Sequence, residues 1–418
     1  MIRSPARTDF DVLVIGGGMV GACVAAMAAA DRDLSSLRIA LVEANPPAQP
    51  PPSDVELRVS AVSQASQRIL DSVGAWSNIP EHHRSAYDEM VVWDAAGKPF
   101  GSAAIHFSAG ESGEAELGHI IENRRLQWAI YGTEAFRKRV TVLRASLEAL
   151  QLGVEHAAAT LSDGRRITAE LVIGADGANS ASRTLAAIQT GGWSYEQRAF
   201  VTHVSTEHPH RRTAWQRFQA HGPIAFLPLA DGRSSIVWTT RPEHAEHLVS
   251  APATAVAAEL SHALDGVLGA VEITSERASF PLQLSFARQY CLPRFALVGD
   301  AAHAVHPLAG QGVNLGFLDA AALIETLSHE IGRGGDAGTM SELRVLRRYE
   351  RWRKSENMLA LGLIDGLNRL FSNSSDALGW VRRTGLSLVN GSAIAKRSLM
   401  GRAMGTSGDV PKLASRSR

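Results

Sequence analysis

Cysteine is almost absent from this chain of 418 residues, which contains only Cys23 and Cys291. Two cysteines cannot build a disulfide framework, so the cytoplasm is the expected compartment. The first strand pattern begins after about ten residues and leaves no room for a signal peptide ahead of it. No apolar run approaches the ~18–20 residues that cross a bilayer. We therefore expect a protein that does not span a membrane.

Net charge is also lacking, because 42 Lys and Arg balance 42 Asp and Glu. Nothing in this total indicates nucleic acid as a partner. The balance hides an asymmetry: from Arg347 onward the chain has 14 Lys or Arg against 5 Asp or Glu. A basic terminal region is a candidate for contact with anionic lipid or an acidic protein. An ordinary solvated helical face is the alternative.

Metal-site spacing is missing too. The histidines at 203, 208, 210, 244, 247, 303 and 306 form no recognised zinc pattern with cysteines or carboxylates, so we expect no metal centre. An apolar fraction of 45% is ordinary for a globular protein, and the length favours two closely joined domains.

The first chemical motif lies near the N-terminus. A buried-type strand at 11–15 leads into Gly16, Gly18 and Gly21, which fit the pattern G-x-G-x-x-G, and an alanine-rich helix follows. A second strand at 38–43 ends in Glu43, placed to bind an adenosine ribose. Together these features predict a dinucleotide site that does not favour a 2′-phosphate.

A second turn follows the strand at 171–174, where Asp176 and Gly177 precede a short helix. Asp-Gly turns are common in proteins, so this one indicates a site only through its place between the other two motifs.

A third stretch has the form of a strand that stops at a polar ligand. The apolar residues 295–298 end in Gly299 and Asp300, and a glycine-bearing loop leads to a helix expected to begin at Asn314. Such a unit directs backbone N–H groups and the helix dipole toward one point. An ordinary tight turn is the alternative. Further candidates in this stretch are Pro307, Gly310, Gln311, Gly312, Val313 and Asn314.

Together the three stretches resemble the fingerprints of the single-component flavin hydroxylases typified by para-hydroxybenzoate hydroxylase. Residues 306–316, HPLAGQGVNLG, followed by Asp319, are especially similar to the ubiquinone-biosynthesis branch, as are residues 365–371. The likeness covers nearly the whole chain. Its departures are the Pro-rich residues 46–52 and Val313, where leucine is usual.

The resemblance implies FAD as the cofactor and assigns roles around it. Asp176 would lie near FAD and incoming NAD(P)H, and Asp300 would meet the ribityl chain. Arg58 would approach the pyrophosphate, although an ordinary surface arginine on a helix is the alternative. A polar contact to the flavin would come from Asn123 or Arg124. The loop beside the flavin ring gives the expected catalytic residues, Pro307, Gly310 and Gly312.

The implied reaction is hydroxylation of a polyprenylated phenol or quinol in ubiquinone biosynthesis, with O₂ and NAD(P)H as co-substrates and a flavin C4a-hydroperoxide as oxygen donor. No second glycine-rich unit is present for a nicotinamide cofactor, which agrees with transient docking. Proteins of a ubiquinone-biosynthesis complex are implied partners. A large apolar substrate tail would explain a basic C-terminal region in peripheral contact with the inner face of the membrane.

The expected fold is α/β, with a Rossmann-like FAD-binding domain, an antiparallel-sheet substrate domain and a helical C-terminal region. FAD-binding parts are expected at 1–80, 118–185 and 281–340, substrate parts at 81–117 and 186–280, and the helical region at 341–418. Within these we expect a hairpin at 90–107, one helix over 244–268 and a helix from Ser341 to about Met358. Apolar residues from 359 to 371 fall at helical spacing; such a stripe is usually core, and a membrane or partner face is the alternative.

Two other functions fit the same motifs. A flavin-dependent reductase, halogenase or hydroxylase of another aromatic or prenylated compound is one, although the Trp-x-Trp-x-Ile-Pro run of halogenases is absent. A non-catalytic FAD-holding subunit of a biosynthetic complex is the other.

Overall fold

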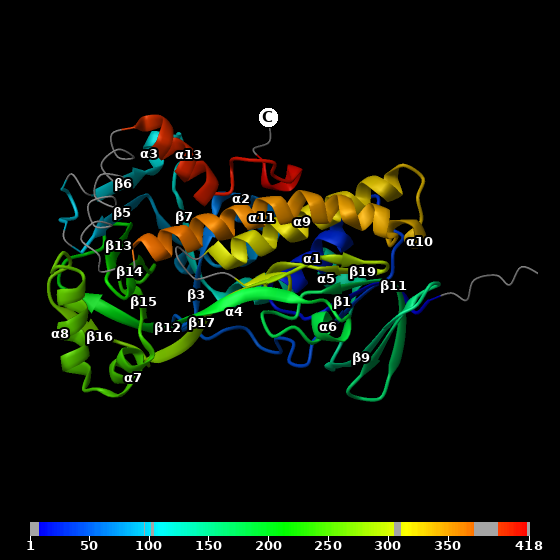
Figure 1. The fold of residues 1–418 in the computed structure, drawn as a ribbon, viewed down its shortest axis with the longest axis horizontal. Coiled ribbons are helices and arrows are strands. Elements are labelled where there is room, and N and C mark those ends of the chain that lie inside the picture. The colour runs from blue at the N-terminus through cyan, green and yellow to red at the C-terminus, as the bar shows by residue number, and fades with distance from the viewer. Residues whose placement is uncertain (1–7, 96, 102–103, 305–310, 372–391, 416–418) are drawn as a thin grey trace, which may run out of the picture.

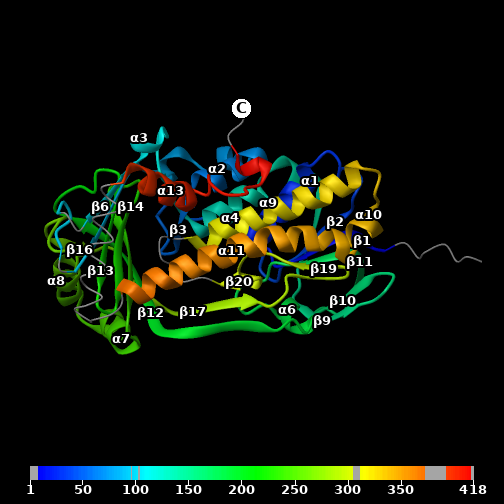
Figure 2. The same cartoon turned by 45° about the horizontal axis from the view of Figure 1, so that its top comes forward.

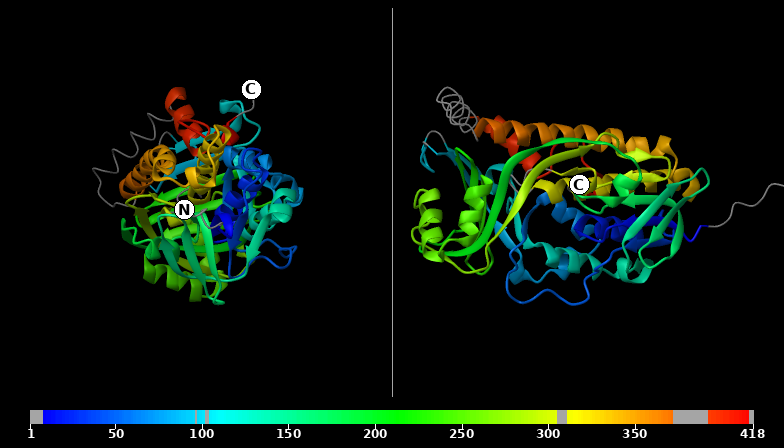
Figure 3. Two further views of the ribbon diagram at one scale, coloured as in Figure 1. Left: turned by 90° about the vertical axis from the view of Figure 1, so that its right-hand side faces the viewer. Right: turned by 60° about the horizontal axis from the view of Figure 1, so that its bottom comes forward.

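A computed structural model describes residues 8–95, 97–101, 104–304, 311–371 and 392–415. Two sheets occupy opposite ends of the molecule, and the long strands β12 (Thr190–Thr206) and β17 (Ala278–Ala287) run between them. Figure 3 shows these two strands arching along one side. The mixed α/β class and the antiparallel second sheet confirm the predicted fold class, whereas the domain boundaries stay a prediction.

The first sheet has a parallel core with the order β19, β11, β1, β2, β8. Its central strands are almost continuous apolar runs, as expected for strands covered on both faces. The parallel strands are β1 (Phe10–Ile15), β2 (Ile39–Val42), β8 (Val140–Leu143), β11 (Arg166–Gly174) and β19 (Phe295–Leu297). Antiparallel additions are β9 (Leu147–Leu152), β10 (Ala157–Leu161) and β18 (Cys291–Leu292).

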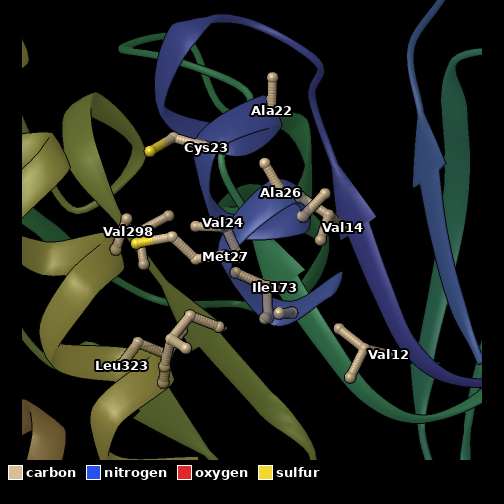
Figure 4. Packing of buried hydrophobic residues seen from close by; sticks show 14 of the residues in the cluster. Val12, Val14, Ala22, Cys23, Val24, Ala26, Met27, Ile173, Val298 and Leu323 are labelled. Atoms are coloured by element: carbon tan, nitrogen blue, oxygen red, sulfur yellow. The ribbon is translucent and has the colours of Figure 1, made fainter. Parts of the chain in front are cut away.

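Helix α1 (Met19–Ala30) is buried on nearly every side because alanines let its neighbours approach closely. It packs against α9 (Gln311–Gly332) and α4 (Asn123–Tyr131), and α9 lies beside α11 (Leu343–Phe371) in both Figures 1 and 2. Figure 4 shows Val24 and Met27 of α1 close to Ile173, Val298 and Leu323. The other helices at this end are α2 (Gln64–Ser72), α5 (Glu134–Arg139), α6 (Ala181–Leu185) and α10 (Ala337–Met340).

The second sheet is antiparallel apart from the parallel pair β5 and β13. The predicted hairpin is confirmed, since β5 pairs with β6. The remaining strands follow the order β20, β17, β12, β15, β14, β13, β5, β6, with β16 beside β12. Their bounds are β5 (Glu89–Asp94), β6 (Ala104–Ser108), β13 (Thr213–Gln219), β14 (Gly222–Pro228), β15 (Ser234–Thr240), β16 (Val271–Ile273) and β20 (His303–Ala304).

Three sequence expectations need correction. The helix expected over 244–268 is two helices, α7 (Pro242–Ser250) and α8 (Ala253–Ala263), because Pro252 cannot continue α7. The helix expected from Ser341 to about Met358 and the helical stripe expected at 359–371 form one continuous helix, α11. The helix expected to begin at Asn314 begins at Gln311.

A three-stranded sheet joins the two ends near Arg58, which precedes a strand and not a helix. Its strands are β3 (Val59–Ser63), β4 (Ser85–Tyr87) and β7 (Gly118–Glu122). The short helices are α3 (Ala109–Ser112), α13 (Ala393–Ala403) and 3-10 turns at Trp76–Asn78, Glu81–His83, Gly299–Ala301 and Lys412–Ala414. Within the described residues, no helix combines the length and apolarity needed to cross a membrane.

Candidate functional site

The three motif turns lie side by side at one edge of the first sheet. They follow β1, β11 and β19, which are adjacent parallel strands and therefore end at the same edge. The chain leaves β1 for β2 on one side, while β11 lies on the other, and such a switch point is where α/β sheets bind ligands. Backbone hydrogen bonds join the turns: Ala175 N–H donates to Ile15 O at 2.8 Å, and Val298 N–H donates to Gly174 O at 3.0 Å.

The first turn has room for nothing larger than glycine at two positions. Gly16 has φ +99°, and a Cβ there would lie 2.6 Å from Ala175 O. A Cβ on Gly21 would lie 1.9 Å from Gly16 O. At Gly18 the situation is reversed, because an added Cβ would meet no protein atom within 4 Å. Gly18 is also the N-cap of α1 and no side chain caps that end, so the helix presents N–H groups suited to a phosphate beside open space.

Glu43 closes this turn from the end of β2. Its carboxylate accepts hydrogen bonds from Gly17 N–H at 2.7 Å and from Asn45 N–H at 2.9 Å. Two residues of α4 hold the same glycine from the other side: Gln127 Nε2 and Tyr131 OH donate to Gly17 O at 2.7 and 3.1 Å. Burial raises the pKa of Tyr131, and the neighbouring Glu43 raises it further, so its hydroxyl stays a donor.

The sequence interpretation missed Gln127 and Tyr131. They lie one and two turns after Asn123, so they share its face of α4. Asn123 itself is half-buried and accepts a hydrogen bond from Ser60 Oγ at 2.7 Å. The other candidate, Arg124, is exposed and pairs with Glu56 at 2.5 Å, away from Gly17.

Arg58 and Asp300 place opposite charges near the third turn. Arg58 is exposed, and its guanidinium carbon lies 5.4 Å from the centroid of the Phe280 ring. Asp300 is also reached by solvent, yet the surrounding protein raises the pKa of its carboxyl group; His303 and Arg58 oppose this shift and Asp319 adds to it.

The side chain of Asp176 is engaged within its own turn. It accepts hydrogen bonds from Ser180 Oγ at 2.5 Å, Ser182 N–H at 2.8 Å and Ser182 Oγ at 2.8 Å. Arg183 then donates to Ala301 O at 2.8 Å, which ties this turn to the third one. Asp176 therefore shapes the backbone here and does not extend a free carboxylate.

Asn314 has a similar internal role. Its buried amide accepts from Ser63 N–H at 3.0 Å and from Ser66 Oγ at 2.7 Å, and it donates to Ala61 O at 2.8 Å. These bonds fasten the start of α9 to β3 and α2. Gln311, Gly312 and Val313 form the first turn of α9.

Gly299 is held in the left-handed region with φ +58°, and a Cβ there would touch the side chain of Val20 in α1. The predicted catalytic residues Pro307 and Gly310 lie outside the described residues. Within the part of the chain that the structure describes, no three His, Cys, Asp or Glu side chains gather as metal ligands.

Comparison with known proteins places this arrangement in a family. The FAD binding domain family matches residues 9–354. The chain is 37% identical over 397 residues to the ubiquinone hydroxylase UbiL of Rhodospirillum rubrum, covering 95% of this chain and 90% of that protein. It is 34% identical over 400 residues to the 3-demethoxyubiquinol 3-hydroxylase of Escherichia coli, covering 94% and 98%.

Solved structures show the same fold at lower identity. The p-nitrophenol 4-monooxygenase PnpA of Pseudomonas putida superposes with a TM-score of 0.74 at 18% identity, covering 95% of this chain and 98% of that one. The extent of these matches confirms the resemblance read from the three motifs. The chain belongs to the FAD-dependent aromatic hydroxylases, in the branch that contains the ubiquinone hydroxylases.

Proposed function

We propose that this chain hydroxylates the aromatic ring of a prenylated phenol or quinol intermediate of ubiquinone biosynthesis, using FAD, NAD(P)H and O₂. The observation that carries this proposal is the convergence of three backbone turns at one sheet edge, in a chain whose relatives are ubiquinone hydroxylases. The Escherichia coli relative is named for a demethoxyubiquinol ring, and a ring of that class is the substrate we infer.

The residues of the site fit FAD. The uncapped N-terminus of α1 and the open space at Gly18 suit the pyrophosphate, and the exposed Arg58 can approach the same anion. Glu43 would bind the adenosine ribose, and Asp300 would accept hydrogen bonds from the ribityl hydroxyls. The positions of these residues around the three turns, and the charges of their side chains, support these roles.

When bound, FAD takes hydride from NAD(P)H and activates O₂ for transfer to the ring. The chain's own part is to orient and shield the reactants. The N-terminus of α9, which begins at Gln311, would supply positive potential to a flavin bound beside it. The second sheet would wall the reacting ring from water, which protects the activated oxygen. Pro307, Gly310 and Gly312 stay the predicted catalytic residues.

Incorporation of labelled oxygen tests this function. Purified holoprotein is given a short-chain prenylphenol under ¹⁸O₂, with NADH and NADPH in separate reactions. We expect one labelled oxygen in a hydroxylated product and reductant consumption that depends on the phenol. The Gly21→Ala protein is the matched negative control, since its added Cβ would lie 1.9 Å from Gly16 O. A flavin-loaded protein that never consumes NAD(P)H would instead be an FAD-holding subunit.

We also propose that the exposed end of α11 meets the membrane in which a prenylated substrate dissolves. Met358, Leu359 and Leu363 are 40–45% exposed there, in the basic C-terminal part of the chain. An apolar stripe within a basic helix favours the surface of an anionic bilayer. A protein of a ubiquinone-biosynthesis complex is the other occupant suited to this stripe.

A further inference from the structure

A fully buried ionic cluster lies behind the turn that carries Asp300. Its centre is Asp319 of α9, which is 0% exposed. The Oδ2 atom of Asp319 accepts from Gly299 N–H at 3.2 Å and faces His303 Nε2 at 2.5 Å. Its Oδ1 atom accepts from Arg353 Nε at 2.9 Å and from Asn357 Nδ2 at 2.9 Å, both on α11. Arg353 also donates to Asn357 Oδ1 at 2.9 Å, which closes the network.

The charge on Asp319 determines how His303 is held. Burial raises the pKa of Asp319, but His303, Arg353 and Asn357 more than offset this, and the net pKa lies below the usual value. An ionised carboxylate only accepts hydrogen bonds, so Nε2 of His303 must carry the hydrogen. The ring is thereby fixed in both tautomer and orientation. Its Nδ1 atom is buried and has no hydrogen-bond partner among the described residues.

The cluster joins the elements that build the proposed cofactor site. Gly299 and His303 flank Asp300 in the third turn. Asp319 belongs to α9, whose first turn follows the predicted flavin loop. A displacement of the Asp319 side chain would therefore change the position of residues 299–303 relative to α9.

A purely stabilising role explains this arrangement poorly. Apolar side chains of similar volume often stabilise a core as well as a buried ion pair does, because both charges lose their hydration. A buried carboxylate whose two oxygens are both hydrogen-bonded can instead fix one geometry, and Asp319 has four such contacts. Two of these partners, Gly299 and His303, flank Asp300 in the third turn, and Asp319 itself belongs to α9.

We propose that Asp319 and His303 are positioning residues for FAD. Asp319 holds His303 as the Nε2–H tautomer and locks residues 299–303 against α9, so that Asp300 and the N-terminus of α9 face the cofactor together. This inference rests on FAD binding by the proposed site and does not require that the hydroxylation substrate be identified.

Two substitutions at one position test the proposal. In His303→Gln the amide nitrogen replaces Nε2 and still donates to Asp319, whereas in His303→Asn it replaces Nδ1 and cannot reach Asp319. Apoprotein is titrated with FAD, and flavin fluorescence reports Kd. We expect the Gln protein to bind FAD within about threefold of the unaltered protein and the Asn protein at least about tenfold more weakly. His329→Asn, the same change at an exposed histidine of α9, is the matched control.

Thermal unfolding of the apoproteins separates positioning from stability. The proposal is overturned if the Gln and Asn proteins bind FAD equally well, or if the loss of affinity only follows the loss of apoprotein stability. Asp319→Asn, which keeps the shape but removes the charge, gives the same readout if His303→Asn does not fold. Unaltered protein that binds FAD but fails to hydroxylate would overturn the proposed function and leave this inference standing.

Discussion

At the residue scale, a substitution at Gly18 distinguishes effects on cofactor binding from effects on folding. Its φ of −63° is ordinary, and an added Cβ would meet no protein atom within 4 Å. Gly18→Ala should therefore leave apoprotein unfolding unchanged while the methyl group obstructs the pyrophosphate and raises the Kd for FAD at least about tenfold. Gly362→Ala is the control in an open position of α11, and it should stabilise the helix by about 1 kcal/mol. Unchanged FAD affinity in the Gly18→Ala protein would contradict the placement of the phosphate.

The carboxyl group of Asp300 gives the site a pH dependence. Because the surrounding protein raises its pKa above the ordinary 3.8, Asp300 becomes protonated at a higher pH than a typical aspartate. The ionised form accepts hydrogen bonds from ribityl hydroxyls, so FAD affinity should fall as the pH decreases through this raised pKa. FAD titrations across acidic pH measure the effect. Asp300→Asn should bind more weakly and lose this pH dependence; a dependence that persists would come from another group.

The sequence predicted the residues that shape a turn through their own backbone conformation. It did not predict the residues that contact that turn from elements distant in the sequence. Gly16 has a positive φ of +99° and Gly21 lies against Gly16 O in the same turn, and the glycine motif encodes both positions. Gln127 and Tyr131 reach Gly17 from a helix more than 100 residues away, so no local pattern marks them. The polar side chain of Asn314 was expected near the cofactor, but it joins α9 to β3 and α2.

At the element scale, a buried ion pair between Asp319 and Arg353 joins α9 to α11. Arg353→Leu removes a donor to Asp319 and should destabilise the protein by about 3–5 kcal/mol, because a buried carboxylate is left incompletely compensated. Arg351→Ala, at an exposed position of the same helix, should change stability by less than about 0.5 kcal/mol. Urea unfolding at neutral pH measures both. Equal effects would show that the buried arginine contributes only packing.

The same carboxylate should contribute to acid sensitivity. The pKa of Asp319 is lower in the folded protein than its ordinary value of 3.8, so its stabilising contribution is present above 3.8 and is lost as the pH falls through the folded-state pKa. Unfolding free energies measured below about pH 4 should therefore decrease more steeply for the unaltered protein than for Asp319→Asn. Parallel curves would contradict this contribution.

Element boundaries were less predictable than element types. The strands of the first sheet are short apolar runs bounded by turn residues, and their sequence is sufficient to place them. The segment 341–358 and the helical stripe at 359–371 were read as two features, although α11 is continuous from Leu343 to Phe371. In contrast, the division at Pro252 could have been predicted, since proline lacks the N–H that α7 would need.

At the scale of the whole molecule, one end carries an exposed apolar stripe within a basic region. The protein should sediment with anionic vesicles at low salt. Much less of it should sediment at high salt, because screening weakens the attraction between the basic region and the anionic lipid. Leu359→Asp with Leu363→Asp should abolish retention on vesicles. Val154→Asp, 95% exposed in the loop between β9 and β10, is the control and should bind normally. If the stripe variant still sediments, α11 is not the contact.

The sequence distinguishes the two sheets, because apolar runs form the strands of the first and alternating apolar and polar residues form those of the second. It does not indicate that two long strands connect the sheets. Strand β12 continues for 17 residues and stays paired with β17 across a register shift between Ser194 and Gln197. Side-chain alternation predicts such strands without indicating how far they extend.

This shared pair of long strands constrains how the protein can be recombined with its relatives. A chimera that imports a foreign substrate sheet must cross over twice, and both crossovers must fall at partnered positions such as Ala199 and Phe280. A mismatch of one residue would turn every following side chain to the opposite face of the ribbon. Genetic exchange within this family should therefore preserve the two strands as a single inherited block.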